Sequence, residues 1–269
     1  MGKNEAYTFV VDNLKIVVAP SRQKMGEFSA MKVSKLIKEL LSKKEELRMV
    51  FAAAPSQNEF LCELTKDKNI DWTRIVAFHM DEYIGLPANS NQLFSKYLTD
   101  HLFSKVGFKE VYIINSQAKD IQKECDRYEM LLKEKPIDIV CLGIGENGHI
   151  AFNDPHVADF NDKKFVKIVD LDEKCRQQQV NDGCFPTITD VPNSAITLTI
   201  PALLSGEFLS IVVPGIRKAE AVKKTLTMNI SSECPATILR THSNAILYLD
   251  KDSAKLFDFK GKTERFEIK

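Results

Sequence analysis

Short apolar runs rich in β-branched residues alternate with longer runs of helical periodicity along this 269-residue chain. The expected strands are residues 14–18, 48–53, 74–78, 111–114, 137–142, 195–200, 209–213 and 245–249. The expected helices are residues 27–44, 57–66, 91–103, 121–134 and 216–226, where apolar residues recur at spacings of three and four. This alternation predicts an α/β fold with three layers, Rossmann-like and doubly wound, in which a mostly parallel central sheet has helices on both faces.

Composition narrows the classes of function. Lys and Arg total 37, and Asp and Glu total 37, so no net charge attracts nucleic acid or an anionic membrane. No apolar run approaches the roughly 18 residues of a membrane span, and the first residues lack a signal peptide's apolar core. Six scattered cysteines form no C-x-x-C pair and are expected to be reduced. We expect a soluble, cytoplasmic protein with one domain over residues 1–269, and neither a nucleic-acid nor a membrane partner.

Polar residues gather directly after four of the expected strands. Ligands bind at the carboxyl ends of parallel strands, so these segments form the candidate site. They are Ala54-Pro55-Ser56-Gln57, His79-Met80-Asp81-Glu82-Tyr83-Ile84-Gly85, residues 143–155, and Pro214-Gly215-Ile216-Arg217-Lys218. Together they supply carboxylates, an imidazole, hydroxyl and amide donors, and a lysine.

The third of these segments contains the glycine pattern Gly143-x-Gly145-x-x-Gly148. Such a pattern binds a dinucleotide when it opens a helix. Here Pro155 follows soon after Gly148 and disfavours helix at the residue before it. A nicotinamide or flavin site is therefore disfavoured, and we expect no cofactor.

His149 follows the glycine turn at once, and Asp154 is available to orient its ring. A neutral imidazole can move a proton between two oxygens near physiological pH. The alternative is a polar side chain that merely fits a tight turn, but the setting favours a catalytic His149. The other histidines lack this setting, and His79 could either line the site or pack in the core.

Asp81 and Glu82 are adjacent carboxylates near the end of expected strand 74–78. They could cap the following helix, or one of them could act as a buried general base. Because side chains alternate along an extended chain, only one of the two should face a substrate.

Ser56 has the sequence context of an ordinary helix N-cap, although the free amides at a helix start also bind phosphate. Lys218 follows a glycine after expected strand 209–213. A lysine in that position is usually solvated, but beside a helix start it would neutralise a phosphate. The chain has no G-x-S-x-G elbow, no recognisable Cys–His pair and no H-E-x-x-H motif, so we expect neither a nucleophilic hydrolase nor a metal.

Taken together, these motifs resemble the glucosamine-6-phosphate deaminase (isomerase) family. The likeness covers nearly the whole chain in the right order, through residues 78–87, 143–155, 191–199, 214–219 and 245–250. It implies a cofactor-independent conversion of glucosamine 6-phosphate or galactosamine 6-phosphate to a ketohexose 6-phosphate and ammonia. The partner would be a small-molecule sugar phosphate. Family members range from monomers to hexamers, so a homo-oligomer stays open.

The resemblance also implies roles for residues. Asp81 would move a proton between C2 and C1 of the sugar, and His149, oriented by Asp154, would assist opening of the pyranose ring. Asn147 stands where relatives often have an aspartate and is assigned to the catalytic group. Lys218 would bind the sugar phosphate. The remaining expected substrate-binding residues are Ser56, Gln57, Glu82, Gly145, Gly148 and Arg176.

Three departures from the family pattern leave the exact hexosamine phosphate open. The phosphate loop commonly reads G-S/T-T-P, whereas this chain has Ala54-Pro55-Ser56-Gln57, in which Pro55 lacks a donor. Asp154 replaces a glutamate, and its shorter side chain predicts a backbone adjustment or a bridging water to His149. Of two arginines expected near the phosphate, Arg176 remains, while the second position falls near Asn181.

Two alternatives remain from the sequence. A 6-phosphogluconolactonase shares the implied fold, but its histidine turn resembles G-H-T-A-S-L-F-P, whereas residues 150–155 here read I-A-F-N-D-P. A non-catalytic sugar-phosphate sensor is supported only by the altered phosphate loop and by Asp154.

Overall fold

The computed structural model describes residues 5–258 and 264–267. Its strands are β1 Glu5–Val11, β2 Leu14–Val18, β3 Leu47–Phe51, β4 Ile75–His79, β5 Asp81–Tyr83, β6 Glu110–Tyr112, β7 Ile139–Leu142, β8 Val166–Asp170, β9 Ser194–Leu198, β10 Phe208–Val213, β11 Ala245–Leu249 and β12 Glu264–Glu267. Its α-helices are α1 Arg22–Leu41, α2 Asn58–Lys66, α3 Phe94–Leu98, α4 Ile121–Lys133, α5 Glu173–Asn181, α6 Ile200–Leu204 and α7 Ala219–Thr227.

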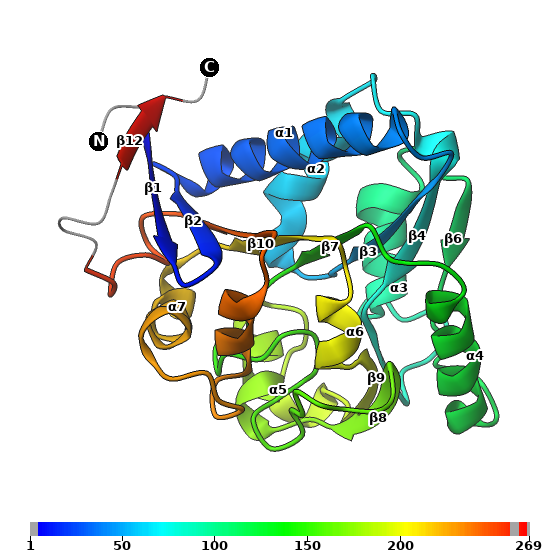
Figure 1. The fold of residues 1–269 in the computed structure, drawn as a ribbon. Coiled ribbons are helices and arrows are strands. Elements are labelled where there is room, and N and C mark those ends of the chain that lie inside the picture. The colour runs from blue at the N-terminus through cyan, green and yellow to red at the C-terminus, as the bar shows by residue number, and fades with distance from the viewer. Residues whose placement is uncertain (1–4, 259–263, 268–269) are drawn as a thin grey trace.

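The central sheet has nine strands in the order β12-β1-β2-β11-β10-β7-β3-β4-β6 (Figure 1). Every pairing from β2 to β6 is parallel, while β1 pairs antiparallel with both β2 and β12. The predicted α/β fold with a mostly parallel sheet is confirmed.

Helices cover both faces of this sheet, as expected for a three-layer fold. Alternate residues of one strand point to opposite faces, so each face has its own apolar cluster. On one face, Leu209 and Ile211 of β10 pack in a cluster with residues of α4, α6 and α7. On the other face, Leu47 and Met49 of β3 pack in a cluster with residues of α1, α2 and α3. Figure 1 shows α1 and α2 together on the second face.

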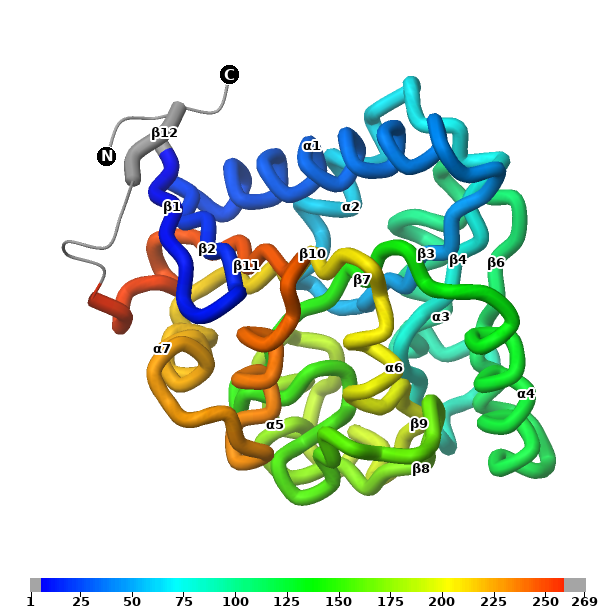
Figure 2. The backbone as a smooth tube through the Cα atoms, viewed as in Figure 1, coloured from blue at the N-terminus to red at the C-terminus, as the bar shows by residue number. Residues whose placement is uncertain are grey.

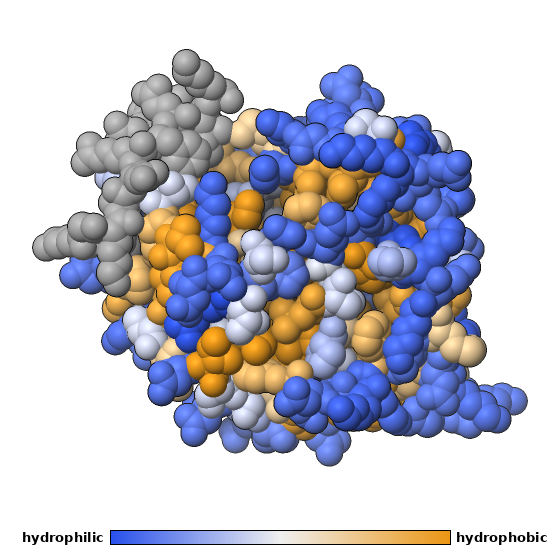
Figure 3. All heavy atoms as spheres, in the orientation of Figure 1, coloured by the Kyte–Doolittle hydropathy of each residue, from blue (hydrophilic) through white to orange (hydrophobic). Residues whose placement is uncertain are grey.

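Helix α1 begins earlier than its predicted start at residue 27. Ser21 is its N-cap, and the Ser21 hydroxyl accepts a hydrogen bond from the Lys24 N–H at 3.2 Å. The side of α1 that faces away from the sheet carries exposed Lys35 and Lys38, and this edge of the molecule is largely hydrophilic in Figure 3. None of the helices among the described residues combines the length and the apolar character that crossing a membrane requires.

A second, smaller sheet was not predicted. Its three antiparallel strands are β5, β9 and β8. The predicted strand 195–200 was therefore placed in the wrong sheet, since β9 pairs with β5 and β8 instead of joining the central sheet. This small sheet fixes the backbone of Asp81, which is opposite Thr197 in the register.

The strand order reverses between β3 and β7, and this reversal positions the site. After β3 the chain moves outward to β4 and β6, then returns to β7 and continues in the other direction through β10 and β11 (Figure 2). In such sheets the loops diverge at the carboxyl ends of the two central strands and leave a crevice for a ligand. The loops that diverge here contain Ser56 and Gln57 after β3 and the glycine-histidine turn after β7.

Candidate active site

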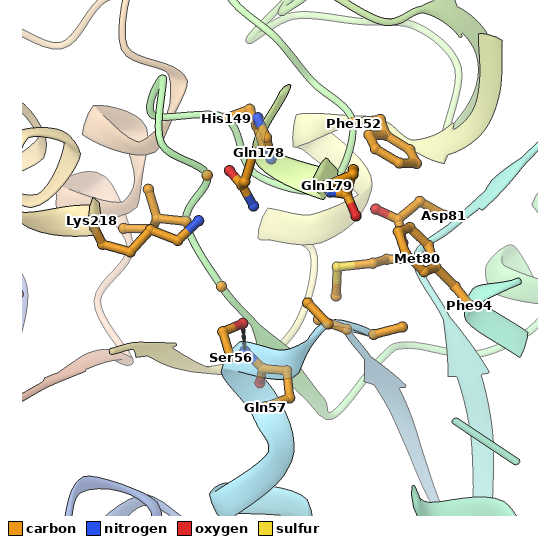
Figure 4. Close-up of a pocket in the computed structure, with 17 residues that line it drawn as sticks. Ser56, Gln57, Met80, Asp81, Phe94, His149, Phe152, Gln178, Gln179 and Lys218 are labelled. Carbon is orange, nitrogen blue, oxygen red and sulfur yellow. Dashed lines mark hydrogen bonds between the residues drawn. The ribbon is translucent and has the colours of Figure 1, made fainter. Parts of the chain in front are cut away.

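A cavity lies at the carboxyl ends of β3 and β7, where the strand order reverses (Figure 4). Six residues predicted from the sequence line it together: Ser56, Gln57, Asp81, Gly145, His149 and Lys218. They come from loops that are far apart in the sequence, so the fold brings the predicted strand ends to one place.

Asp81 is the buried carboxyl group of the cavity and is only 6% exposed. Burial, with a smaller contribution from the charge of Glu82, raises the pKa of Asp81 well above its usual value. A carboxylate without a full hydration shell binds a proton more tightly than one in water. Asp81 therefore has the environment of a general base.

Glu82 points away from the cavity. Its carboxylate accepts hydrogen bonds from the backbone N–H groups of Phe94 and Ser95, both at 2.9 Å, and of Tyr83 at 3.1 Å. These contacts hold the start of α3, which is the capping alternative considered for this pair. Asp81 lines the cavity and Glu82 does not, as expected if only one of the two carboxylates faces a substrate. The assignment of Glu82 to substrate binding stays a prediction.

The ring of His149 lies directly against Gly145. A Cβ atom at Gly145 would lie 2.2 Å from both Cε1 and Nε2 of that ring, so only glycine fits. The Gly145 N–H donates to the His149 carbonyl at 2.8 Å and closes the turn. Gly148 has a φ of +87°, and a Cβ there would lie 2.5 Å from Cys234 Sγ. Gly148 thus shapes the turn and does not line the cavity, and its assignment to substrate binding stays a prediction.

Asp154 contacts His149 directly. Nδ1 of His149 and Oδ1 of Asp154 are 3.0 Å apart, and both residues are buried. The distance is that of an ion pair, although Nδ1 lacks the geometry of a regular hydrogen bond. No bridging water is needed, because the turn between them, where Ala151 adopts a φ of +48°, brings the shorter aspartate within reach. Burial alone would raise the pKa of Asp154, but contacts with His149 and Asn147 outweigh it and lower that pKa.

Asn147 forms hydrogen bonds with both members of this pair. Its Nδ2 donates hydrogen bonds to Asp154 Oδ1 at 2.9 Å and to Asp172 Oδ2 at 3.0 Å, and its Oδ1 accepts one from the His149 N–H at 3.0 Å. Asn147 does not line the cavity. These contacts orient the His149–Asp154 pair. The placement of Asn147 in the catalytic group stays a prediction.

Lys218 is the only lysine or arginine among the described residues that line the cavity. It ends the 3₁₀ turn Ile216–Lys218 after β10 and is 6% exposed. Burial lowers the pKa of Lys218 to about 8, against the opposing charges of Asp182 and Glu146. Figure 4 shows Lys218 and Asp81 on opposite sides of the cavity, so a ligand between them meets a cation at one end and a carboxyl group at the other.

Ser56 and Gln57 lie in the 3₁₀ turn Pro55–Gln57 that precedes α2. The Gln57 side-chain Nε2 donates to Ser56 Oγ at 3.1 Å and to the Val212 carbonyl at 3.3 Å. The backbone N–H of Gln57 is bonded to the Ala54 carbonyl at 2.9 Å. This loop therefore offers a serine hydroxyl to the cavity but fewer free amides than a regular helix start.

Two other candidate residues lie outside the cavity. The Arg176 guanidinium donates to the carbonyl of Ile188 at 2.6 Å and to that of Val191 at 3.0 Å, and Arg176 does not line the cavity. Its substrate contact stays a prediction. His79 is fully buried, and its Nε2 accepts a hydrogen bond from the Ile114 N–H at 2.8 Å. Burial lowers the pKa of His79 to about 3, which keeps the ring neutral in the core.

Gln178 and Gln179 line the cavity from α5 and were missed in the sequence. Helix α5 carries mostly polar residues, so no apolar stripe marked it as a helix. A usable signal was Asp172, whose side chain caps α5 by accepting the Cys175 N–H at 2.6 Å. Figure 4 shows Gln178 between His149 and Lys218, and Gln179 on the side of Asp81.

Aromatic rings form the wall beside Asp81. Phe94 and Phe152 line the cavity and stack with their centroids 5.5 Å apart, and Tyr83 contacts both rings from behind. These rings exclude water from one side of the carboxyl group, which is consistent with the raised pKa of Asp81.

Two groups of side chains have the composition of a metal site among the described residues. The first is His149, Asp154 and Cys175, and the second is Asp154, His156 and Asp172. Within each group the ligand atoms lie within 4.8 Å of one another. The first group borders the cavity through His149.

Comparison with known proteins identifies a family of sugar-phosphate enzymes that resemble this chain. The profile of a family described as glucosamine-6-phosphate isomerases/6-phosphogluconolactonase matches residues 20–248. A glucosamine-6-phosphate deaminase of Bacillus cereus (strain B4264) is 37% identical over 222 residues, which is 82% of each chain. Another from Bacillus cereus (strain G9842) is 35% identical over 243 residues, covering 90% of this chain and 89% of that one.

Solved structures share the fold. A structure described as a monomeric glucosamine-6-phosphate deaminase superposes with a TM-score of 0.81 at 30% identity, covering 90% of this chain and 99% of that one. A 6-phosphogluconolactonase from Thermotoga maritima superposes with a TM-score of 0.71 at 21% identity, covering 88% and 99%. At that lower identity the likeness concerns the fold alone.

Proposed function

Because the chain belongs to the family of glucosamine-6-phosphate isomerases and 6-phosphogluconolactonases, we propose that it is a hexosamine-6-phosphate deaminase. It converts glucosamine 6-phosphate or galactosamine 6-phosphate into a ketohexose 6-phosphate and ammonia. The observation that carries this proposal is the presence, in one cavity, of the buried carboxyl group of Asp81 and the ring of His149, which Asp154 contacts from outside the cavity lining. Removal of a proton from carbon requires a positioned base, which Asp81 supplies. Ring opening requires a separate group that carries a proton, which His149 supplies.

The substrate spans the cavity from Lys218 to Asp81. The phosphate on C6 binds near the Lys218 ammonium and the Ser56 hydroxyl, and C1 and C2 lie near Asp81 at the other end. This direction is supported by the single buried cation on one side and the carboxyl group on the other (Figure 4). A phosphate beside the ammonium favours its protonated form, so the lowered pKa of Lys218 rises when the ligand binds.

Ring opening comes first and uses His149. The imidazole accepts the proton of the anomeric hydroxyl and delivers a proton to the ring oxygen as the bond between C1 and that oxygen breaks, which leaves an open-chain aldehyde. Asp154, whose Oδ1 is 3.0 Å from His149 Nδ1, fixes the orientation of the ring and stabilises the imidazolium that forms transiently.

Proton transfer between carbons follows and uses Asp81. The carboxylate removes the proton from C2 and the electron pair forms a C1–C2 double bond, while the electrons of the C1=O double bond move to that oxygen, which takes up a proton from solvent. The resulting enolamine then receives at C1 the proton held by Asp81. The nitrogen on C2 is then an imine, to which water adds before ammonia leaves. One water is consumed and one ammonia is released, so the products are a ketohexose 6-phosphate and ammonia. The aromatic wall beside Asp81 supports this step, because a poorly hydrated carboxylate is a stronger base.

A substrate panel tests the proposal. The protein is incubated with glucosamine 6-phosphate, galactosamine 6-phosphate, glucose 6-phosphate and 6-phosphogluconolactone, and ammonia release and lactone loss are followed separately. We expect ammonia from at least one hexosamine phosphate and no accelerated loss of the lactone. Lactone hydrolysis without ammonia would assign the lactonase activity named in the family description, and tight binding without turnover would make the protein a sugar-phosphate sensor.

We also propose where the protein acts and in what form. The enzyme acts in the cytoplasm as a single domain on a small-molecule substrate, and the steps above need no cofactor. Light scattering on the purified protein distinguishes a monomer, as described for one solved relative, from a homo-oligomer.

A further inference from the structure

His149, Asp154 and Cys175 bring three kinds of metal ligand together behind the wall of the cavity. An imidazole nitrogen, a carboxylate oxygen and Sγ lie within 4.8 Å of one another, and all three residues are buried. We propose that these three side chains form a Zn²⁺ site whose occupation switches the enzyme off.

The donor set selects the class of metal. One imidazole nitrogen, one carboxylate oxygen and one thiolate sulfur suit Zn²⁺, whereas Mg²⁺ and Ca²⁺ take oxygen ligands. Three protein ligands with a fourth position open to water is a common zinc arrangement. Around a tetrahedral ion the ligand atoms lie about 3.5 Å apart, so the present separations, 3.0 Å for the nitrogen–oxygen pair and at most 4.8 Å overall, require small side-chain shifts.

The surroundings already orient two of the three ligands. Asp154 is held by the Asn147 side chain at 2.9 Å and by the Asp172 backbone N–H at 3.2 Å, as the outer shell of a metal site holds its carboxylate. His149 Nδ1 is buried without a regular hydrogen bond and faces the same point. A Zn²⁺ ion would give this nitrogen a directed partner.

Binding is coupled to loss of the thiol proton. Burial, followed by the charges of Asp154 and Asp172, raises the pKa of Cys175 well above its usual value. Zinc binds the thiolate and releases that proton, so affinity for the ion increases as the pH rises.

Occupation stops the reaction because the ion takes both members of the proton-transferring pair. The imidazole becomes a metal ligand through Nδ1, and a positive charge next to the ring opposes the uptake of a proton on the other nitrogen. Asp154 then neutralises the metal and no longer stabilises an imidazolium. Cys175 is not among the residues that line the cavity, and no step of the proposed reaction uses its thiol.

Cobalt substitution tests the site without reference to any substrate. Co²⁺ is added to the reduced, full-length protein under anaerobic conditions, and the near-ultraviolet absorption is recorded. We expect a thiolate-to-cobalt charge-transfer band in the wild type and in Cys184→Ser, a matched control whose cysteine lies outside the ligand group. The band should be absent in Cys175→Ser, which keeps the shape of the side chain.

Inhibition supplies a second measurement, which rests on the proposed deaminase activity. Zn²⁺ should abolish ammonia release, a chelator should restore it, and Cys175→Ser should weaken the inhibition by at least about tenfold. A wild type without the charge-transfer band, or a band that persists in folded Cys175→Ser, would overturn the site. If the band behaves as expected while no hexosamine phosphate is turned over, the metal site stands and the proposed function fails.

Discussion

Gly145 leaves no room for a side chain beneath His149, since a Cβ atom at this position would come within 2.2 Å of the ring. The replacement Gly145→Ala must therefore displace the imidazole. We expect kcat for ammonia release to fall by about a hundredfold, because small errors in the position of a proton carrier have large effects on rate. Overpacking should also lower the free energy of unfolding by about 1–3 kcal/mol. Gly107→Ala is the control, as a Cβ there meets nothing within 4 Å. Equal activity of the two variants would contradict the packing argument.

Asp81→Asn should remove the base and stabilise the fold. We expect at least a hundredfold loss of ammonia release, on the order of the contribution of a general base, together with loss of solvent-deuterium exchange at C2. A carboxyl group whose pKa is raised by folding contributes stability that is present below its unfolded pKa and lost as the pH rises through its folded pKa. At neutral pH the amide avoids this loss, so chemical denaturation should show a more stable variant.

Glu82→Gln should differ from Asp81→Asn in both respects: it should lower stability and leave exchange at C2 intact. The Glu82 carboxylate accepts three backbone N–H groups at the start of α3, and an amide oxygen cannot satisfy all of them. We expect a stability loss of about 1–2 kcal/mol, with C2 exchange retained. If Glu82→Gln abolished exchange in a folded protein while Asp81→Asn retained it, the two carboxyl groups would have been assigned the wrong way round.

Asp154→Glu restores the residue that the family pattern has, yet it should impair this enzyme. Asp154 is fully buried and already reaches His149 at 3.0 Å, so a longer side chain must displace its neighbours or the ring. We expect an unfolding free energy lower by about 1–3 kcal/mol and a reduced kcat. Asp154→Asn keeps the size and removes the charge, so it should reduce kcat without this packing loss. Higher activity in Asp154→Glu would show that the turn relaxes to admit the longer side chain.

Lys218 should set the alkaline limb of the pH profile. Its ammonium, with a pKa of about 8 in the free enzyme, binds phosphate only when protonated. We therefore expect kcat/KM to decrease above about pH 8, since this ratio reports groups of the free enzyme. Lys218→Arg should move the limb to higher pH, and Lys218→Ala should raise KM. Arg176→Ala is the contrast: it should lower stability with little change in KM, because Arg176 bonds to backbone carbonyls outside the cavity.

The middle of the central sheet was predictable because strands such as β3, β4 and β7 are buried on both faces. Strand β7 is an uninterrupted apolar run, and β10 has Ser210 as its one polar residue. Strand β10, predicted at 209–213, is observed as Phe208–Val213. The small sheet was missed because β5 has only three residues, two of them acidic. Its strand β9 has the same apolar character as the central strands, so composition alone did not tell which sheet it joins.

Site residues that come directly after strands were predictable from the sequence. Residues whose contact with the cavity depends on the direction of a side chain were less predictable. Asp81, His149 and Lys218 follow strands, and the fold brings them together. Arg176 and Gln178 are two positions apart on one helix, yet only the glutamine faces the cavity. The helix rotation that decides this is set by packing of α5, which its polar sequence does not encode as an apolar stripe. The contact between Asp154 and His149 likewise depends on the turn conformation at Ala151.

The reversal of strand order between β3 and β7 has a consequence for how activity appears during folding. No short stretch of the chain contains the site, because Ser56, Asp81, His149 and Lys218 come from distant segments that meet when β7 lies between β3 and β10. Contacts between segments so distant in sequence are made at a high entropic penalty, and they are slow to form. Catalytic activity should therefore return late during refolding. It should appear only when the central sheet is complete and should be absent from partly folded chains.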